Sequence, residues 1–258
     1  MMGTVYLVGA GPGAADLLTL RAARLLGEAD IVFHDALVPA EILELAPRAE
    51  KIAVGKRCGR HSTAQRFINK RLADAAQKHG VVVRLKGGDP MLFGRAHEEL
   101  DYLQKQKIRA EVVPGITAAL AASADLQVSL TRRGISRSVV FATTRAAEGE
   151  APSGWVRAIA AADTGVLYMA SRDAAQVKAE LLAAGMRADL PVAVAENASL
   201  DSAALHVGVL NQLPELTARC GSGPTLILLG DVFSALARAE VVDRPAQPVV
   251  ERYRRLPA

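Results

Sequence analysis

The chain has 258 residues, of which 50% are hydrophobic, 22% charged and 4% aromatic, with 21 glycines and 12 prolines. This composition is typical of a globular protein, and it excludes collagen, low-complexity disorder and a disulfide-stapled scaffold. The formal net charge of +4 at pH 7 suits an anionic partner, but so small an excess also fits a protein without one. The scarcity of aromatic side chains disfavours a surface on which single-stranded nucleic acid stacks.

The start of the sequence, its hydropathy and its cysteines indicate where the protein works. The first residues open directly on a strand pattern without a charged leader, and the longest weakly polar stretch, 118–130, is too short to cross a bilayer. The two cysteines, Cys58 and Cys220, lie far apart and form no repeated metal-ligand spacing. We therefore expect a soluble cytoplasmic protein in a reducing compartment, without a resident metal.

Strand and helix patterns alternate along the chain. Nine runs rich in β-branched residues predict strands at 5–8, 31–33, 51–54, 81–85, 110–113, 138–142, 164–169, 192–195 and 224–229. Thr19 is the predicted cap of a helix that buries Leu26, and Ser62 or Thr63 caps an amphipathic helix that ends before Gly80. This alternation predicts mostly parallel sheets covered by helices on both faces.

The Val-Pro-Gly-Ile turn at 113–116 is the best candidate for a domain boundary, because about as many strand–helix units follow it as precede it. Two sheets of that size fit the length better than one continuous sheet. We expect two α/β domains, over residues 1–114 and 115–240, followed by a flexible basic tail over 241–258.

The first motif, Gly-Ala-Gly-Pro-Gly-Ala at 9–14, follows the opening strand and matches a dinucleotide-binding loop, with Asp30 or Asp35 as the later acidic residue. Two features disfavour that interpretation. Pro12 lacks the amide that a pyrophosphate needs, and the cap at Thr19 starts the helix several residues late. A nicotinamide-dependent oxidoreductase therefore stays an alternative.

Two further clusters also follow predicted strands. Gly87, Gly88 and Asp89 let the backbone approach a ligand and add a carboxylate, although a tight turn capped by aspartate has the same sequence. The segment VGKRCGRH at 54–61 is flanked by glycines and carries three cations, which suits a loop that closes over an anion or simply a solvated basic loop. Cys58 and His61 have no second pair nearby, so a metal site is not predicted there.

These clusters, in this order, are more specific together than any one of them. The sequence resembles the tetrapyrrole methyltransferases, and within that family the members that methylate uroporphyrinogen III. The segments that carry the resemblance are VYLVGAGPG, LLTLRA, ADIVFHDALV, VGKRCGRH, QRFIN, VVRLKGGDPMLFGR, VVPGITAA, SLTRRG, LYM and PVAVAEN. The resemblance as a whole extends from about Thr4 to Arg238, nearly the whole chain.

The resemblance implies a homodimer of two-domain α/β subunits with the active site in the trough between the domains. It implies methyl transfer from S-adenosyl-methionine to carbons 2 and 7 of uroporphyrinogen III, which gives precorrin-2 for sirohaem or cobalamin and leaves S-adenosyl-homocysteine as by-product. The partner is then a small-molecule tetrapyrrole, with no nucleic acid, membrane or metal involved.

The resemblance also implies roles for individual residues. Asp35 matches the family's proton acceptor and Lys56 its proton donor. The matching cofactor-binding positions are Pro12, Gly87, Gly88, Asp89, Leu92, Thr117, Ala118, Met169 and Ala198. The eight carboxylates of the substrate suggest contacts with Arg57, Arg60, Arg132 and Arg133.

The sequence departs from the family at a few positions. Ala198 stands where a glycine that contacts the cofactor is common, and Ala96-His97 replaces a usual Gly-Gly pair. His34 replaces a common tyrosine beside Asp35. None of these changes removes a proposed catalytic group. A methylase of the same superfamily acting on a later corrin precursor or on rRNA is a further alternative, as is a non-catalytic binding module.

Overall fold

The computed structural model describes residues 2–55, 62–146, 149, 153–238 and 244–245, and it divides into two compact units, Met1–Ala118 and Ala119–Ala258. The sequence predicts a boundary between residues 114 and 115. That position lies in the segment that joins the last strand of the first unit to helix α5 (Ala118–Leu126).

The first unit contains a parallel sheet with the strand order β3-β2-β4-β1-β5. Its strands are β1 (Thr4–Gly9), β2 (Ile31–His34), β3 (Glu50–Ala53), β4 (Val81–Lys86) and β5 (Ala110–Val113). Its helices are α1 (Leu20–Glu28), α2 (Ala40–Glu44), α3 (Ser62–Ala76) and α4 (Ala96–Lys105), with a short 3-10 helix η1 (Ala15–Leu17). The predicted parallel pairing is confirmed for this sheet.

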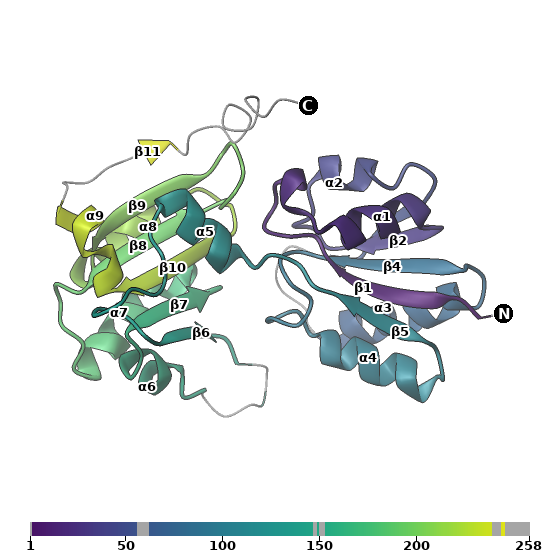
Figure 1. The fold of residues 1–258 in the computed structure, drawn as a ribbon. Helices are drawn as coiled ribbons and strands as arrows, with labels where there is room; N and C mark the ends of the chain where they lie inside the picture. Colours follow the sequence, from purple (N-terminus) through teal and green to yellow (C-terminus); the bar gives the residue numbers. More distant parts are fainter. Residues whose placement is uncertain (1, 56–61, 147–148, 150–152, 239–243, 246–258) are drawn as a thin grey trace, which may run out of the picture. The chain divides into compact units, whose positions relative to one another are not determined.

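Helices cover both faces of this sheet, as the continuous apolar strands predict. In Figure 1, α1 and α2 lie on one side of the sheet and α3 and α4 on the other. Val8, which faces the α1 side, and Leu7, which faces the α3 side, are both fully buried, because successive strand side chains point to opposite faces. Each face therefore has its own apolar layer.

The start of α1 explains why the loop after β1 is not a dinucleotide fingerprint. The Thr19 hydroxyl accepts a hydrogen bond from the amide of Ala22 at 3.1 Å, so the predicted cap is confirmed. The helix begins at Leu20, with η1 between it and the glycine loop. In a dinucleotide site the loop opens directly into the helix, whose N-terminus holds the pyrophosphate.

The second unit contains a mixed sheet with the strand order β11-β9-β8-β10-β7-β6. Its strands are β6 (Val139–Thr143), β7 (Thr164–Tyr168), β8 (Pro191–Glu196), β9 (Ala204–Val209), β10 (Thr225–Gly230) and β11 (Arg244–Pro245). Besides α5, its helices are α6 (Trp155–Ala160), α7 (Ala174–Ala183), α8 (Leu213–Ala218) and α9 (Ser234–Arg238). Three short 3-10 helices are η2 (Ser171–Asp173), η3 (Leu210–Gln212) and η4 (Asp231–Phe233).

The second sheet differs from the expected parallel pairing. Only β6 and β7 pair in parallel, and β8 pairs antiparallel with both β9 and β10. Residues 197–203 alone connect β8 to β9, which is too short for the crossover that a parallel pair requires. Strand β9 was not among the predicted strands. Its sequence, ALHVGV, interrupts the apolar pattern with His206 and Gly208.

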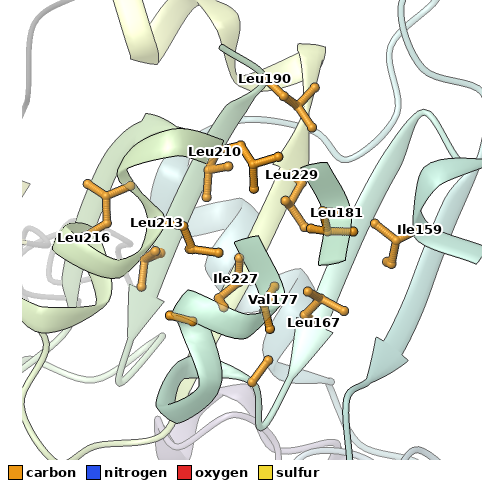
Figure 2. Packing of buried hydrophobic residues seen from close by; sticks show 14 of the residues in the cluster. Ile159, Leu167, Val177, Leu181, Leu190, Leu210, Leu213, Leu216, Ile227 and Leu229 are labelled. Carbon is orange, nitrogen blue, oxygen red and sulfur yellow. The ribbon is translucent and has the colours of Figure 1, made fainter. Parts of the chain in front are cut away.

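The core of the second unit lies between its sheet and helices α6, α7 and α8. Figure 2 shows leucines and isoleucines from strands and helices packed together there, including Ile159, Leu167, Leu181 and Ile227. These four side chains are at most 1% exposed. This layer supplies the unit with a continuous apolar core.

Part of the predicted flexible tail forms a strand. Arg244 and Pro245 form β11 and pair with β9, whereas residues 246–258 lie outside the described part of the chain.

Among the described residues, no helix has the length and apolar character needed to cross a membrane.

Candidate functional site

Four of the predicted site segments meet at one edge of the first sheet. Because its strands are parallel, their carboxyl ends lie together, and ligands of open α/β sheets bind at such an edge. Pro12 follows β1, Asp35 follows β2, the Gly87–Asp89 turn follows β4, and Thr117 follows β5. The fold of the first unit thus brings together residues that are far apart in the sequence.

Three glycines pack backbone against backbone at this edge. A Cβ atom on Gly115 would lie 2.3 Å from the carbonyl oxygen of Gly88 and 2.8 Å from the Cα of Gly9. Gly88 has a φ of +67° and exchanges two backbone hydrogen bonds with Gly11. Only glycine tolerates such contacts, so these residues set the close spacing of the three loops.

Asp89 fastens two of these loops together. One of its carboxylate oxygens accepts a hydrogen bond from the amide of Gly115 at 2.9 Å, and the other accepts one from the amide of Met91 at 2.8 Å. The amide of Leu92, which is half-buried, donates to the carbonyl of Asp89. Both carboxylate oxygens of this predicted cofactor contact therefore have backbone partners within the first unit.

Asp35 stands immediately after β2, at the same edge of the sheet as the loops. Its amide donates to the carbonyl of Leu85, and its side chain remains 30% exposed. The Arg84 guanidinium, which is only 3% exposed, donates to the Asp35 carboxylate at 2.5 Å. One face of the carboxylate is thus held by a buried cation while the group still reaches solvent.

Arg84 belongs to a buried group of charges beneath this edge. Its Nε donates to Glu99 at 3.0 Å, and Lys86 Nζ donates to the other oxygen of Glu99 at 2.9 Å. Burial acts to lower the pKa of Arg84, but the Asp35 and Glu99 carboxylates outweigh it, so this pKa is raised. Burial lowers the pKa of Lys86, and the charge of Arg84 acts in the same direction.

The sequence prediction did not include Arg84, Lys86 or Glu99 among the site residues. A signal for them was present in β4, where Val82, Arg84 and Lys86 alternate onto one face of a strand that should be apolar on both faces. Two cations at alternate positions of such a strand require buried anions. The first turn of the following helix supplies one, Glu99.

The glycine-flanked basic loop lies largely outside the described residues. Lys56, Arg57 and Arg60 all belong to residues 56–61, so their predicted roles have no structural description. Gly55, which precedes them, packs directly on the Asp35 segment. A Cβ atom on Gly55 would lie 2.3 Å from the amide nitrogen of Ala36. Gly55, where this segment begins, therefore lies against the backbone of Asp35 and Ala36.

The second unit separates the other predicted residues. Met169 follows β7 and Ala198 follows β8, and these strands run in the same direction because each pairs antiparallel with β10. Met169 has a φ of +57° and is 41% exposed, whereas Ala198 is buried. The two predicted cofactor contacts thus lie at one edge of the second sheet.

Arg132 and Arg133 lie at the opposite edge. The turn that carries them is closed by Ser136, whose hydroxyl pairs with the hydroxyl of Thr164, the first residue of β7, at 2.9 Å. A cavity of about 470 Å³ is lined here by Thr131, Arg132, Arg133, Ser136 and Arg137. Within the second unit, the arginines are not brought to the edge that carries Met169.

Asp30, one of the two candidates for the later acidic residue of a dinucleotide site, lies at the opposite edge of the first sheet, before β2. Its side chain accepts hydrogen bonds from the amides of Gly80 and Val81, at the start of β4.

The described residues contain no cluster of three or more histidine, cysteine, aspartate or glutamate side chains arranged to hold a metal ion.

Comparisons with solved structures show the same architecture in methyltransferases. The native form of uroporphyrin III C-methyl transferase from Thermus thermophilus is 36% identical, with a TM-score of 0.80, over 95% of this chain and 99% of its own. A Thermus thermophilus uroporphyrin-III C-methyl transferase in complex with S-adenosyl homocysteine is also 36% identical, with a TM-score of 0.78, over 90% of this chain and 100% of its own.

Comparisons with curated proteins point in the same direction. Siroheme synthase 1 of Klebsiella pneumoniae and the siroheme synthase of Zymomonas mobilis are each 44% identical over 89% of this chain. The chain spans about half the length of these relatives, 49% in each case. The sequence model of the tetrapyrrole (corrin/porphyrin) methylases matches residues 4–214. The chain belongs to the tetrapyrrole (corrin/porphyrin) methylase family.

Proposed function

We propose that this chain is an S-adenosyl-methionine-dependent C-methyltransferase that methylates uroporphyrinogen III at carbons 2 and 7 to give precorrin-2. The support from relatives is the 36% identity to a uroporphyrin III C-methyl transferase that this chain matches over 99% of that protein's length. The observation that carries the proposal is local to the first unit. A partly exposed carboxylate, Asp35, shares one sheet edge with the glycine loops that the family resemblance assigns to the cofactor.

The glycine loops suit a methyl donor that must approach the backbone. Among the described residues, and apart from the chain neighbours, a Cβ atom on Gly87 would meet only Leu37, at 3.7 Å, and one on Gly88 would meet only the Cα of Thr117, at 4.0 Å. The bound donor supplies an electrophilic methyl group on a sulfonium. We propose that Pro12, Leu92, Thr117 and Ala118 in the first unit, and Met169 and Ala198 in the second, contact it.

Asp35 is the proposed proton acceptor. When a pyrrole carbon attacks a methyl group, the ring gains positive charge, and a proton must then leave the macrocycle. A carboxylate close to that position stabilises the charge and takes up the proton, and one general base contributes about 10²–10⁴-fold to the rate. The remaining task of the protein is to align the two reactants, which can supply ~7–11 kcal/mol.

The other proposed contacts come from the family resemblance. Lys56 is the proposed proton donor, and it follows Gly55, which lies against the backbone of Asp35. Arginines form charge-assisted pairs with carboxylates, so Arg57 and Arg60 are proposed to bind the acidic side chains of the substrate. Arg132 and Arg133 stay a weaker prediction, because their turn lies at the edge of the second sheet opposite to Met169.

A labelling experiment tests the reaction. The protein is incubated without oxygen with S-adenosyl-methionine that carries a ¹³C-methyl group and with uroporphyrinogen III, and the product is examined by mass spectrometry and NMR. We expect two methyl groups on one tetrapyrrole, at carbons 2 and 7. Parallel incubations contain rRNA, a later methylated corrin precursor, or NAD with simple alcohols. Label found only in RNA or only in the later precursor contradicts the proposal.

Assembly and location are separate proposals. We propose a homodimer in the cytoplasm, without a nucleic-acid or membrane partner, as the family resemblance and the sequence composition predict. Sedimentation equilibrium of the full chain measures the mass of the assembly directly. A monomer at micromolar concentration with full activity contradicts the dimer, and it leaves the proposed reaction untouched.

A further inference from the structure

Strand β4 points two cations into a layer that should be apolar. Val82 packs in the cluster between the first sheet and helices α3 and α4, and side chains two residues apart on a strand share a face. Arg84 and Lys86 therefore enter the same layer, where each residue is 3% exposed. Charged side chains are almost never buried so deeply unless they are paired.

Glu99 pairs both of these cations from the facing helix. It lies on α4 and is completely buried. One carboxylate oxygen accepts from Arg84 Nε at 3.0 Å and from Gln65 Nε2 at 3.2 Å, and the other accepts from Lys86 Nζ at 2.9 Å. Gln65 is itself held by Asn69, through a hydrogen bond of 2.9 Å. Glu99 is thus the centre of a polar network in an otherwise apolar layer.

These contacts give the Arg84 guanidinium one orientation. Its Nε edge faces Glu99, its Nη1 donates to the carbonyl of Leu85 at 3.2 Å, and its Nη2 donates to Asp35. A guanidinium is planar, so fixing one edge fixes the direction of the other. The position of Glu99 therefore determines where Arg84 holds the Asp35 carboxylate.

Stability alone does not account for this arrangement. Replacing a buried group of ion pairs by well-packed apolar residues is often neutral or stabilising, because the charges lose their hydration. Here three charged side chains lie in the buried layer, and the fourth, Asp35, emerges 30% exposed at the edge that carries the glycine loops. The network leads from the core to the candidate site.

We propose that Glu99 is a positioning residue for methyl transfer, acting through Arg84 to orient the carboxylate of Asp35. The inference rests on the proposed function, in which Asp35 accepts the proton. Without the Glu99 charge, Arg84 and Lys86 share a buried layer in which no other described carboxylate pairs with them except Asp35. Arg84 then loses the acceptor that fixes its Nε edge, and the Asp35 carboxylate shifts with it.

Three variants test this role. Glu99→Asp keeps the charge but shortens the side chain, so it should fold while failing to reach Arg84. Glu99→Gln with Lys86→Met removes one anion and one cation together, which keeps the buried charge balanced. Glu111→Gln is the matched control, because Glu111, on β5, pairs with Arg109 at the exposed surface and not in the buried layer. Thermal unfolding, kcat, KM for the tetrapyrrole and Kd for S-adenosyl-homocysteine are measured for each.

We expect Glu99→Asp and the double variant to lower kcat about tenfold to a hundredfold, since a shift of about 1 Å near the reacting atoms can cost ~10²-fold. KM and Kd should stay near the wild-type values, because the variants lose an interaction that acts only in the transition state and does not contribute to binding of the substrate or the cofactor. The double variant should unfold near the wild-type temperature, and the control should match the wild type throughout. A folded Glu99→Asp or double variant with wild-type kcat overturns the proposal.

A second measurement separates this inference from the proposed function. The Arg84 Nε–H group gives a side-chain signal in ¹⁵N NMR, and its exchange with water reports whether Glu99 still holds it. We expect slow exchange in the wild type and much faster exchange in both Glu99 variants. Unchanged exchange overturns the inference even if the enzyme is active. Absence of methyl transfer in the wild type contradicts the proposed function and the catalytic part of this inference, whereas the exchange measurement still decides whether Glu99 orients Arg84.

Discussion

The two sheets of the molecule hold their buried charges in different ways. On the second sheet, the buried Glu196 carboxylate accepts hydrogen bonds from the backbone amides of Gly221 and Gly223, and the cluster of Figure 2 between this sheet and helices α6, α7 and α8 is hydrophobic. Between the first sheet and helices α3 and α4 the layer contains Arg84, Lys86 and Glu99 among its apolar side chains. Charge in a core is costly unless it is fully paired. The proposed roles of Asp35 and Glu99 give the charges of the first layer a use at the edge of its sheet.

The largest expected effect comes from the exposed end of the buried charges. Replacing Asp35 by asparagine preserves size but removes the proposed base, so kcat should fall by about 10²–10⁴-fold. Binding of S-adenosyl-homocysteine should change little, because Asp35 is not among the proposed cofactor contacts. Steady-state kinetics and calorimetry measure the two quantities. Equal losses of turnover and affinity would count against a catalytic role.

Two substitutions of leucine by alanine, one in each buried layer, test whether only the first layer affects catalysis. Leu103 on α4 and Leu181 on α7 are both fully buried, and replacing either by alanine should cost about 2–5 kcal/mol of unfolding free energy. Only Leu103→Ala disturbs the helix that carries Glu99. We therefore expect a lower kcat per folded molecule for Leu103→Ala and an unchanged one for Leu181→Ala. Denaturant unfolding and kinetics check this, and equal kinetic effects would break the comparison.

A smaller loss is expected where the loops of the first sheet meet. An alanine at Gly115 would put its Cβ 2.3 Å from the carbonyl oxygen of Gly88, so the loops must separate. Overpacking of this kind costs about 1–3 kcal/mol, and affinity for S-adenosyl-homocysteine should fall with it. A Cβ atom on Gly27, within α1, would meet no described atom within 4 Å outside its own stretch of helix, and Gly27→Ala should stabilise the fold by ~0.5–1 kcal/mol. Gly115→Ala binding as tightly as wild type would be the contrary result.

The smallest effect concerns the margin of the second layer, where Cys220 is partly buried. Burial, together with the Glu196 carboxylate, raises the pKa of the Cys220 thiol to about 11. In a Cys58→Ser variant, alkylation by iodoacetamide should accelerate until about pH 11, whereas the alkylation rate of an exposed thiol levels off above the ordinary pKa of 9.0. A plateau by about pH 9 would show that the thiol is not buried.

The same shift has a consequence for stability. The pKa of the Cys220 thiol is raised from its ordinary value of 9.0 to about 11 in the folded chain. The protonated thiol therefore makes its full contribution to the free energy of unfolding below pH 9. This contribution is lost as the pH rises toward 11, since the unfolded chain releases the proton first. Thermal unfolding of wild type and Cys220→Ala across this range measures the difference.

Much of the site was predictable because glycines mark it. The loops at Pro12, Gly88 and Thr117 each follow an apolar strand, and parallel strands must bring their carboxyl ends to one edge. Arg132 and Arg133 precede the predicted strand at 138–142, whereas Met169 follows the one at 164–169. Parallel pairing of these two strands therefore places the arginines at the edge opposite to Met169, and their candidate role came from the family resemblance and not from this pattern.

By itself, the sequence determined the alternation of strands and helices, the cap at Thr19, the glycine turns and the resemblance to a methylase family, since all of these depend on residue type and short spacing. The tertiary structure decided the mixed pairing of the second sheet and the burial of Glu99 against Arg84 and Lys86. The pairing depends on how long each connection is and which strand edges remain free. The buried ion pairs depend on a helix packing across a sheet, so charges distant in sequence compensate each other only once the chain is folded.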